Sequence, residues 1–330
     1  MSDAAAAWRA APKVELHLHL EGAAPPALAL ARAAETGAAL DDLIAPGGGY
    51  RWTDFTSFLV AYDRVARLFG EPEAAGRLCE AVLQAGAAEG VIYAELIVSP
   101  DFAGCDAGRW AAYLAALEAG ADAAERDAGI VARFIATGVR HFGPEAVRRA
   151  AALAVGRPSP RLAGFGLAGD ERAGRPADFA PAFALAREAG LRLTAHAGEF
   201  AGPESVRGAL DDLGVARIGH GVRAVEDPAL VARLAAEGVT LELCPTSNVA
   251  LGLYPSIADH PIHRLAAAGC RVTVSTDDPP FFEATMSGEY AALAACRWSE
   301  AALRGPARTA LDAAFCDFET RARLLTRLGL

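Results

Sequence analysis

Residues 14–20, with the sequence VELHLHL, alternate apolar and polar side chains from end to end. Successive side chains of a β-strand point to opposite faces, so this pattern predicts a strand with one aliphatic and one polar face. His17 and His19 lie on the polar face, together with Glu15 and, just beyond the run, Glu21. Two imidazoles placed two residues apart near a strand end can converge on one metal ion.

Seven further apolar runs follow the first, and alanine-rich amphipathic stretches separate them. Residues 228–237 show the helical signals most clearly, because Asp227 stands at the N-cap position and a proline at the first helical position. Gly190, Gly238 and Gly269 fall where a helix should end and a strand begin. The seven runs cover residues 91–98, 130–137, 162–168, 191–197, 216–220, 239–244 and 271–276.

Eight strands that alternate with helices predict a (β/α)8 barrel, the TIM barrel of the α/β class. A doubly wound open sheet is the alternative. The long stretch 23–90 must hold extra helices between the first and second strands, and it is a natural source of an active-site lid. We expect residues 12–330 to form a single domain behind a disordered or frayed tail at residues 1–11.

The composition argues against several classes of protein. The 330 residues are 53% hydrophobic, which allows a large core, yet no apolar run reaches the length of about 18 residues that crosses a membrane. The net charge of −10 argues against nucleic-acid partners, whose phosphates need basic residues. No signal peptide opens the chain and the six cysteines form no CxxC pair, so we expect a cytoplasmic protein. The sequence leaves the oligomeric state open.

Polar residues recur at the ends of three other predicted strands, just before glycine or proline turns. They are His196 in the fifth strand, His220 in the sixth, and Asp277 with Asp278 in the eighth. Catalytic side chains of such barrels come from the carboxyl ends of strands, so these groups should meet the first-strand histidines. Three imidazoles and one carboxylate suit zinc, which lowers the pKa of bound water to about 7. One ion is expected, because the only lysine, Lys13, precedes the first strand and cannot bridge a second ion.

Other polar residues are interpreted as structural. His141, His260 and His263 lack the strand-end placement, so we interpret them as loop or helix-start residues. Glu95, inside the second strand, is interpreted as a structural hydrogen-bond partner, with support of a metal ligand as the alternative.

Six motifs occur in a fixed order along the chain. They are PKVELHLHLEG at 12–22, LAGDE at 167–171, HAGE at 196–199, RIGHG at 217–221, CPTSN at 244–248 and TDDP at 276–279. In this order the set resembles the adenosine deaminase family of the amidohydrolase superfamily, from residue 12 to about residue 290. The resemblance implies zinc-dependent hydrolytic deamination of an adenine-type purine, with the metal bound by His17, His19, His196 and Asp277.

The resemblance also implies roles for four further groups. Glu199 would protonate ring nitrogen N1, and a dry pocket would favour the protonated carboxyl that this role requires. His220 would orient the attacking hydroxide and accept its proton. Asp278 would contact N7, and the backbone of Gly169 would contact N3, where a missing side chain lets the purine approach.

The substrate is less closely defined. The motifs at 167–171 and 218–221 favour adenosine or 2′-deoxyadenosine as substrate. Glu21 points instead to the adenine-type relatives, because adenosine deaminases usually carry an aspartate there. The alternatives are therefore adenine, an N6-substituted adenine or aminodeoxyfutalosine. An amidohydrolase that opens a cyclic amide and a non-catalytic purine-binding barrel are the remaining hypotheses.

Four apolar residues before the second strand recur at helical spacing. Phe55, Phe58, Leu59 and Tyr62 are predicted either to pack in the core or to cap a substrate pocket. A cap of this kind would exclude water and leave the polar edges of a purine to the strand-end residues.

Overall fold

The computed structural model describes residues 3–329 of the chain. Its eight strands are parallel and pair in sequence order within one sheet. A bridge between Leu18 and Asp277 joins the last strand to the first, so the sheet closes and the predicted (β/α)8 barrel is confirmed. The strands are β1 (Lys13–His19), β2 (Val91–Val98), β3 (Val131–Val139), β4 (Leu162–Ala168), β5 (Arg192–Ala197), β6 (Arg217–His220), β7 (Thr240–Leu243) and β8 (Arg271–Val274).

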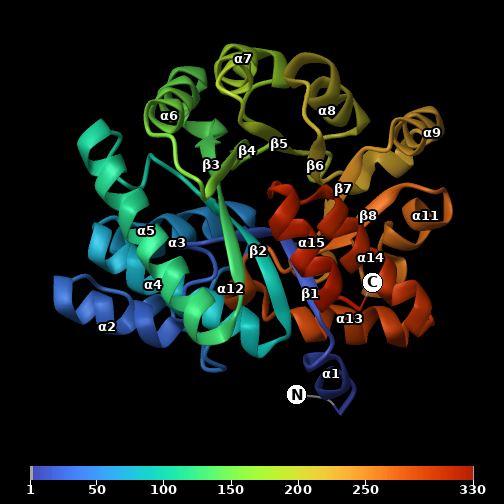
Figure 1. The fold of residues 1–330 in the computed structure, drawn as a ribbon, viewed down its shortest axis with the longest axis horizontal. Coiled ribbons are helices and arrows are strands. Elements are labelled where there is room, and N and C mark those ends of the chain that lie inside the picture. Colours follow the sequence, from blue (N-terminus) through green and yellow to red (C-terminus); the bar gives the residue numbers. More distant parts are fainter. Residues whose placement is uncertain (1–2, 330) are drawn as a thin grey trace.

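Helices follow the strands and surround the barrel (Figure 1). As predicted, extra helices lie between β1 and β2, namely α2 (Pro26–Thr36), α3 (Phe55–Leu68) and α4 (Pro72–Ala88). The other α-helices are α1 (Asp3–Arg9), α5 (Ala107–Ala128), α6 (Pro144–Gly156), α7 (Ala180–Glu188), α8 (Pro203–Gly208), α9 (Pro228–Glu237), α10 (Pro245–Ala250), α11 (Ile262–Ala267), α12 (Pro279–Phe282), α13 (Met286–Ala295), α14 (Glu300–Ala313) and α15 (Phe318–Arg327). Short helical turns are η1 (Asp41–Leu43), η2 (Arg140–Phe142), η3 (Pro176–Phe179), η4 (Ala209–Leu213), η5 (Val222–Glu226) and η6 (Ile257–Asp259).

The start of the described chain differs from the frayed tail that the sequence predicted. Residues 3–9 form α1, and Trp8 packs against Tyr290 of α13 with ring centroids 5.8 Å apart. The buried ammonium of Lys13 donates hydrogen bonds to the carbonyl oxygens of Trp8 and Ala11. The contact between Trp8 and Tyr290 joins distant parts of the chain, so a local pattern could not reveal it. Residues 1 and 2 lie outside the described residues.

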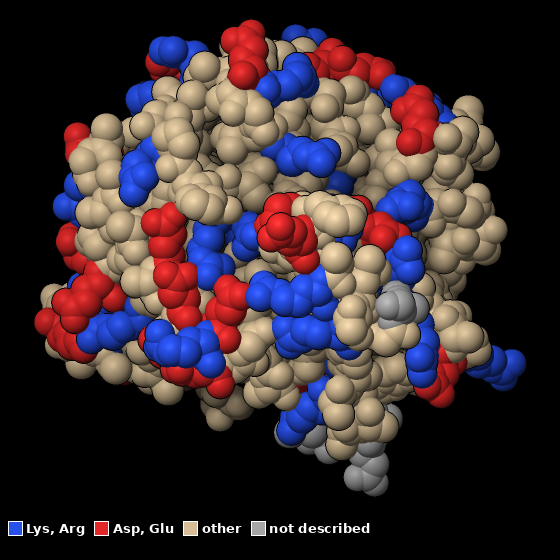
Figure 2. All heavy atoms as spheres, in the orientation of Figure 1, with Lys and Arg blue, Asp and Glu red and all other residues tan. Residues whose placement is uncertain are grey.

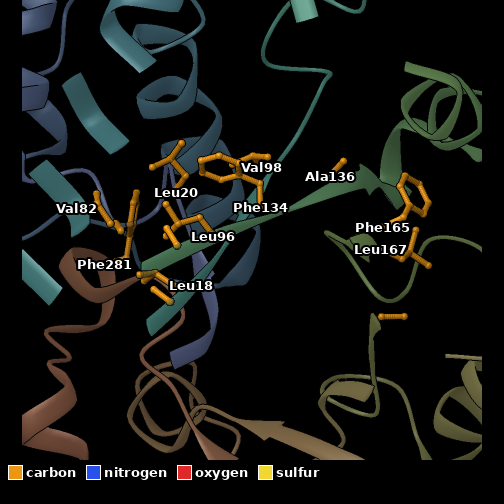
Figure 3. Packing of buried hydrophobic residues seen from close by; sticks show 14 of the residues in the cluster. Leu18, Leu20, Val82, Leu96, Val98, Phe134, Ala136, Phe165, Leu167 and Phe281 are labelled. Carbon is orange, nitrogen blue, oxygen red and sulfur yellow. The ribbon is translucent and has the colours of Figure 1, made fainter. Parts of the chain in front are cut away.

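The aliphatic face of β1 packs into the main core between strands and helices. Leu18 and Leu20 lie close to Leu96 and Val98 of β2 and to Phe134 of β3 (Figure 3). All five are buried, and each such side chain stabilises the fold by about 1.5–3 kcal/mol. Because this face is committed to the core, the alternate residues of β1 turn toward the barrel interior.

The carboxyl-terminal helices α14 and α15 lie across the strand ring in Figure 1. Leu311 of α14 and Leu324 of α15 belong to one buried cluster with Val14 and Leu16 of β1 and Tyr93 of β2. Val14 and Leu16 of this cluster lie in the first half of β1, toward its amino end. These helices therefore close one end of the barrel and leave the carboxyl ends of the strands for the pocket.

Charged side chains of both signs lie next to one another over much of the face in Figure 2. Arg161, for example, contacts both Asp122 and Glu125, at 2.6 and 2.8 Å. No helix among residues 3–329 is long and apolar enough to cross a membrane. All six cysteines are unpaired.

Candidate active site

Three histidines and an aspartate converge at the carboxyl ends of β1, β5 and β8. The ligand atoms of His17, His19, His196 and Asp277 lie within 4.8 Å of one another, and all four residues are buried. Nε2 of His196 lies 3.0 Å from Nε2 of His17 and 3.1 Å from Nε2 of His19. Oδ1 of Asp277 lies 3.4 and 3.3 Å from the same two atoms of His17 and His19.

The other ring nitrogens show which atoms turn toward this centre. Nδ1 of His17 lies 2.8 Å from a carboxylate oxygen of Glu242, and Nδ1 of His196 lies 3.0 Å from the carbonyl oxygen of Leu167. Both neighbours are acceptors, so each Nδ1 carries the proton and each Nε2 turns a lone pair toward the centre. Lone pairs that face one another and a carboxylate repel unless a cation lies between them. The donor set therefore fits a divalent metal, and its composition suits zinc.

The closure of the barrel itself places Asp277 beside the histidines. The amide of His19 donates a hydrogen bond to the carbonyl oxygen of Asp277 at 3.0 Å. The amide of Asp277 in turn donates to the carbonyl oxygen of His17 at 3.2 Å. Asp277 and His220 both adopt positive φ, at 66° and 59°. Such backbone costs about 1–3 kcal/mol in residues other than glycine and concentrates at functional sites.

Glu199 and His220 lie beside this cluster, on the loop after β5 and at the end of β6. Burial raises the pKa of Glu199 well above its ordinary value, and the charge of Asp277 adds to the effect. Burial lowers the pKa of His220 to about 3. Both shifts favour the neutral forms of these two groups, whose Oε1 and Nδ1 atoms lie 3.6 Å apart.

Asn248, from the CPTSN motif, links the two groups. Its amide nitrogen donates to Oε1 of Glu199 at 3.2 Å and lies 3.3 Å from Nδ1 of His220. Its carbonyl oxygen lies 3.0 Å from Nε2 of His260, which is buried. Sequence reasoning gave Asn248 no individual role and assigned His260 to a loop or helix start. The available signal was the position of the motif directly after the seventh strand.

Asp278 lies in the same cavity, and its Oδ1 atom is buried without a hydrogen-bond partner in the described structure. Burial raises the pKa of this carboxyl group well above its ordinary value, and Asp277 adds to the shift. Buried polar atoms are rarely left unpaired, so this oxygen fits a ligand that supplies the partner. Gly22 makes room for it, because a Cβ atom there would lie 1.6 Å from Oδ1 of Asp278.

Glu21 is buried at the wall of the cavity, where two tyrosines engage its carboxylate. Tyr62 of α3 donates to Oε2 at 3.2 Å, and Tyr113 of α5 donates to Oε1 at 3.0 Å. Burial raises the pKa of Glu21 to about 7. Sequence reasoning missed Tyr113, which is 92 positions away and carried no local signal.

The cavity is lined by all four apolar residues that were predicted either to pack in the core or to cap a substrate pocket, namely Phe55, Phe58, Leu59 and Tyr62. Phe58 is also part of the core, with only 5% of its surface exposed. The ring of Phe55 lies against that of Phe200, with centroids 4.1 Å apart. Helix α3 therefore forms an apolar wall over the strand-end polar groups.

Gly169 lines the cavity with φ at +95°, and a Cβ atom there would lie 2.6 Å from Nδ1 of His141. His141 accepts a hydrogen bond from the amide of Asp170 at 3.2 Å and also lines the cavity. Its position in η2, directly after β3, is a strand-end position. The prediction that His141 is a loop or helix-start residue is confirmed, since it lies in η2. The third strand runs two residues further than the apolar pattern indicated, which brings this turn to the cavity.

A buried chain of charges leads from His17 to the opposite end of the barrel. Glu242 contacts His17 and also lies 2.5 Å from the guanidinium of Arg217. Arg217 lies 2.5 Å from Glu95, which accepts a hydrogen bond from Tyr93 at 2.8 Å. Glu95 is thus a structural hydrogen-bond partner, as predicted, and reaches a histidine of the cluster only through Arg217 and Glu242. No individual role was predicted for either of these two from the sequence.

Comparison with known proteins agrees with the family resemblance of the motifs. A sequence model of the family described as Adenosine deaminase matches residues 12–329. The chain belongs to the adenosine deaminase family. It is 52% identical to a protein named adenine deaminase from Chelativorans sp. (strain BNC1), over 96% of this chain and 97% of that one.

Solved structures of the family agree in fold. The adenine deaminase from Arthrobacter aurescens superposes with a TM-score of 0.88 at 31% identity, covering 97% of this chain and 98% of that one. An amidohydrolase from Burkholderia ambifaria with bound Zn superposes with a TM-score of 0.89 at 28% identity, covering 100% and 93% of the two chains. The chain is a hydrolase that acts on a C–N bond of a purine.

Proposed function

We propose that the protein hydrolyses adenine to hypoxanthine and ammonia, with one zinc ion bound by His17, His19, His196 and Asp277. The observation that best supports purine deamination is that this donor set lies in one cavity with Glu199, His220 and Asp278. Zinc in such a site would lower the pKa of water and polarise the reacting carbon centre.

The protein's own groups account for the movement of protons. The protonated carboxyl of Glu199, held by Asn248, delivers a proton to ring nitrogen N1 as water attacks C6. The neutral imidazole of His220 takes the proton that the attacking water loses. His220 then passes its proton to the amino group, which leaves as ammonia. The C6 hydroxyl proton returns to Glu199, and N1 keeps its proton in the product hypoxanthine.

Positioning of the base falls to two other groups. Asp278 accepts a hydrogen bond from N7–H, or donates to N7 when it is itself protonated, and so satisfies the unpartnered Oδ1. Gly169 offers its backbone to N3, since no side chain stands in the way. The aromatic wall of α3 excludes water and packs on the purine face.

Adenine is proposed in place of the adenosine that the motifs favoured. The related proteins named adenine deaminase support this alternative better than the adenosine expectation. Glu21 supports it as well, because both carboxylate oxygens already accept hydrogen bonds from Tyr62 and Tyr113. A carboxylate engaged in this way is poorly placed to receive a ribose hydroxyl.

Release of ammonia from adenine tests the proposal, with Glu199→Gln as the matched variant. The zinc-loaded wild-type protein should form hypoxanthine and ammonia in equal amounts. Glu199→Gln should keep its zinc and lose activity by about 100-fold or more. Equal rates for the two proteins would refute the role of Glu199, and no ammonia from any adenine-type purine would refute the reaction.

Two wider expectations belong to the same proposal. We propose that residues 12–330 act as one domain, supported by the single closed sheet and by the family match over residues 12–329. We also propose a cytoplasmic location, in keeping with six unpaired cysteines.

A further inference from the structure

Glu171, from the loop after β4, takes the backbone amides of the loop that carries Glu199. Its Oε2 atom accepts hydrogen bonds from the amides of Glu199, Phe200 and Ala201, at 3.0, 2.7 and 2.8 Å. Its Oε1 atom accepts from the amide of Gly198 at 2.5 Å and from the hydroxyl of Ser205, also at 2.5 Å. Four consecutive amides therefore point at one buried carboxylate.

This arrangement leaves the loop little freedom. Consecutive amides that surround an anion form a concave nest, and the two oxygens of an ionised carboxylate offer enough acceptor sites to satisfy them all. Arg223 binds the carbonyl groups of the same loop. Its amide donates to the carbonyl oxygen of Gly198 at 2.8 Å, and its guanidinium donates to the carbonyl oxygen of Phe200 at 2.5 Å. Gly198 itself adopts φ of +74°, so a turn is built at this position.

The turn that follows Glu171 is held by a buried arginine. Arg140, nearly fully buried, donates to the carbonyl oxygens of Ala173 at 3.0 Å and Gly174 at 2.9 Å, which fixes the turn that follows Glu171. Glu171 does not line the cavity and cannot touch a substrate there. Any influence it has on the reaction must pass through the loop that it holds.

We infer that Glu171 is a positioning residue for catalysis: its carboxylate fixes residues 198–201 so that the Glu199 carboxyl is aimed at N1 and the Phe200 ring supports Phe55. The inference rests on the proposed function, since it needs Glu199 as the acid. Displacement of a reacting group by about 1 Å can lower a rate by about 100-fold, so the precision of this loop matters for kcat.

Glu171→Gln tests the inference, because the glutamine amide would point a donor at backbone donors. We expect kcat on adenine to fall by about 100-fold, KM to change by less than about 3-fold, and the zinc content to stay the same. The matched control is Glu204→Gln in the first turn of α8, directly after this loop, where an exposed carboxylate accepts a hydrogen bond from the amide of Gly202 at 3.1 Å. The control should keep wild-type kcat.

A double-variant cycle separates positioning from general loss of structure. If Glu171 acts through Glu199, then Glu171→Gln should lower kcat by less than about 3-fold when Glu199 is already Gln. The same large loss in both backgrounds would overturn the inference, because it would show an effect that does not depend on Glu199.

Amide hydrogen exchange gives a readout that does not depend on activity and so survives failure of the proposed function. Amides of residues 198–201 should exchange at least about 10-fold faster in Glu171→Gln than in the wild-type protein, with unchanged exchange in the strands. Unchanged protection of these amides would overturn the inference. If Glu171→Gln does not fold, Glu171→Asp carries the same tests, since it keeps the charge but draws the carboxylate back by about 1.5 Å.

Discussion

The contact between Gly22 and Asp278 allows a sharp test of the site. In Gly22→Ala the new Cβ atom would lie 1.6 Å from Oδ1 of Asp278, so the carboxyl group must retreat by about 2 Å to reach an ordinary contact distance. A displacement of that size removes a hydrogen bond, whose heavy atoms must lie within about 3.2 Å. The backbone can stay in place, because the clashing atoms all belong to side chains, namely Oδ1 and Cγ of Asp278 and, at 2.9 Å, Cε2 of Tyr62.

The expected magnitude follows from the bond that is lost. A hydrogen bond to a charged group contributes about 1.5–3 kcal/mol, so kcat/KM for adenine should fall by about 10- to 150-fold. The free energy of unfolding should change by less than about 1 kcal/mol, because alanine also reduces the freedom of the unfolded chain. Zinc content should stay the same.

The assay compares Gly22→Ala with Gly305→Ala under identical conditions. Gly305 is exposed in α14 and a Cβ atom there would meet nothing within 4 Å. The Gly305 variant should match the wild type in kcat/KM and should be more stable in urea unfolding by up to about 1 kcal/mol, because alanine favours a helix interior over glycine. If Gly22→Ala, folded and loaded with zinc, also kept wild-type kcat/KM, the assignment of Asp278 to substrate binding would be refuted.

Three further predictions concern the substrate, the metal and the effect of pH. Glu21→Asp should release one or both tyrosine hydroxyls and raise the kcat/KM ratio of adenosine to adenine by about 10-fold; an unchanged ratio in steady-state assays would count against Glu21. A chelator should abolish activity and lower the Tm, and one equivalent of zinc should restore both, whereas full activity without metal would contradict the site. Burial raises the pKa of Glu289 from 4.5 to about 8, so the folded protein binds this proton more tightly and its unfolding free energy falls as the pH rises through that range. Glu289→Gln keeps an acceptor for the amide of Thr246 and should reduce the fall between pH 5.5 and 8.5 by about 3 kcal/mol in urea unfolding; identical slopes would contradict this prediction.

Much of the fold could be predicted, because local sequence patterns indicate the strands and helices of the barrel. Each strand is a short apolar run, and Asp227 caps its helix as expected, with its carboxylate accepting from the amides of Ala229 and Leu230. The convergence of the strand-end histidines and Asp277 followed from the rule that carboxyl ends of parallel strands meet.

The parts that escaped prediction depend on distant pairs. Glu171 and Glu21 lie in motifs, but nothing local in the sequence indicates that Glu171 contacts the loop after β5 or that Tyr113 contacts Glu21. The chain from Arg217 to Glu242 was equally hidden, since buried ion pairs inside a barrel follow from side-chain packing and not from periodicity. Helix α1 was missed for the same reason, because Trp8 finds its partner on α13.

The ratio of kcat/KM for adenine to that for adenosine, measured on the protein with one zinc per chain, tests the account most directly. The cavity, with Glu21 held by two tyrosines, predicts that adenine is converted to hypoxanthine at least about 100-fold more efficiently than adenosine to inosine. A ratio below one would contradict the proposed substrate and would support adenosine, the substrate that the other motifs favoured.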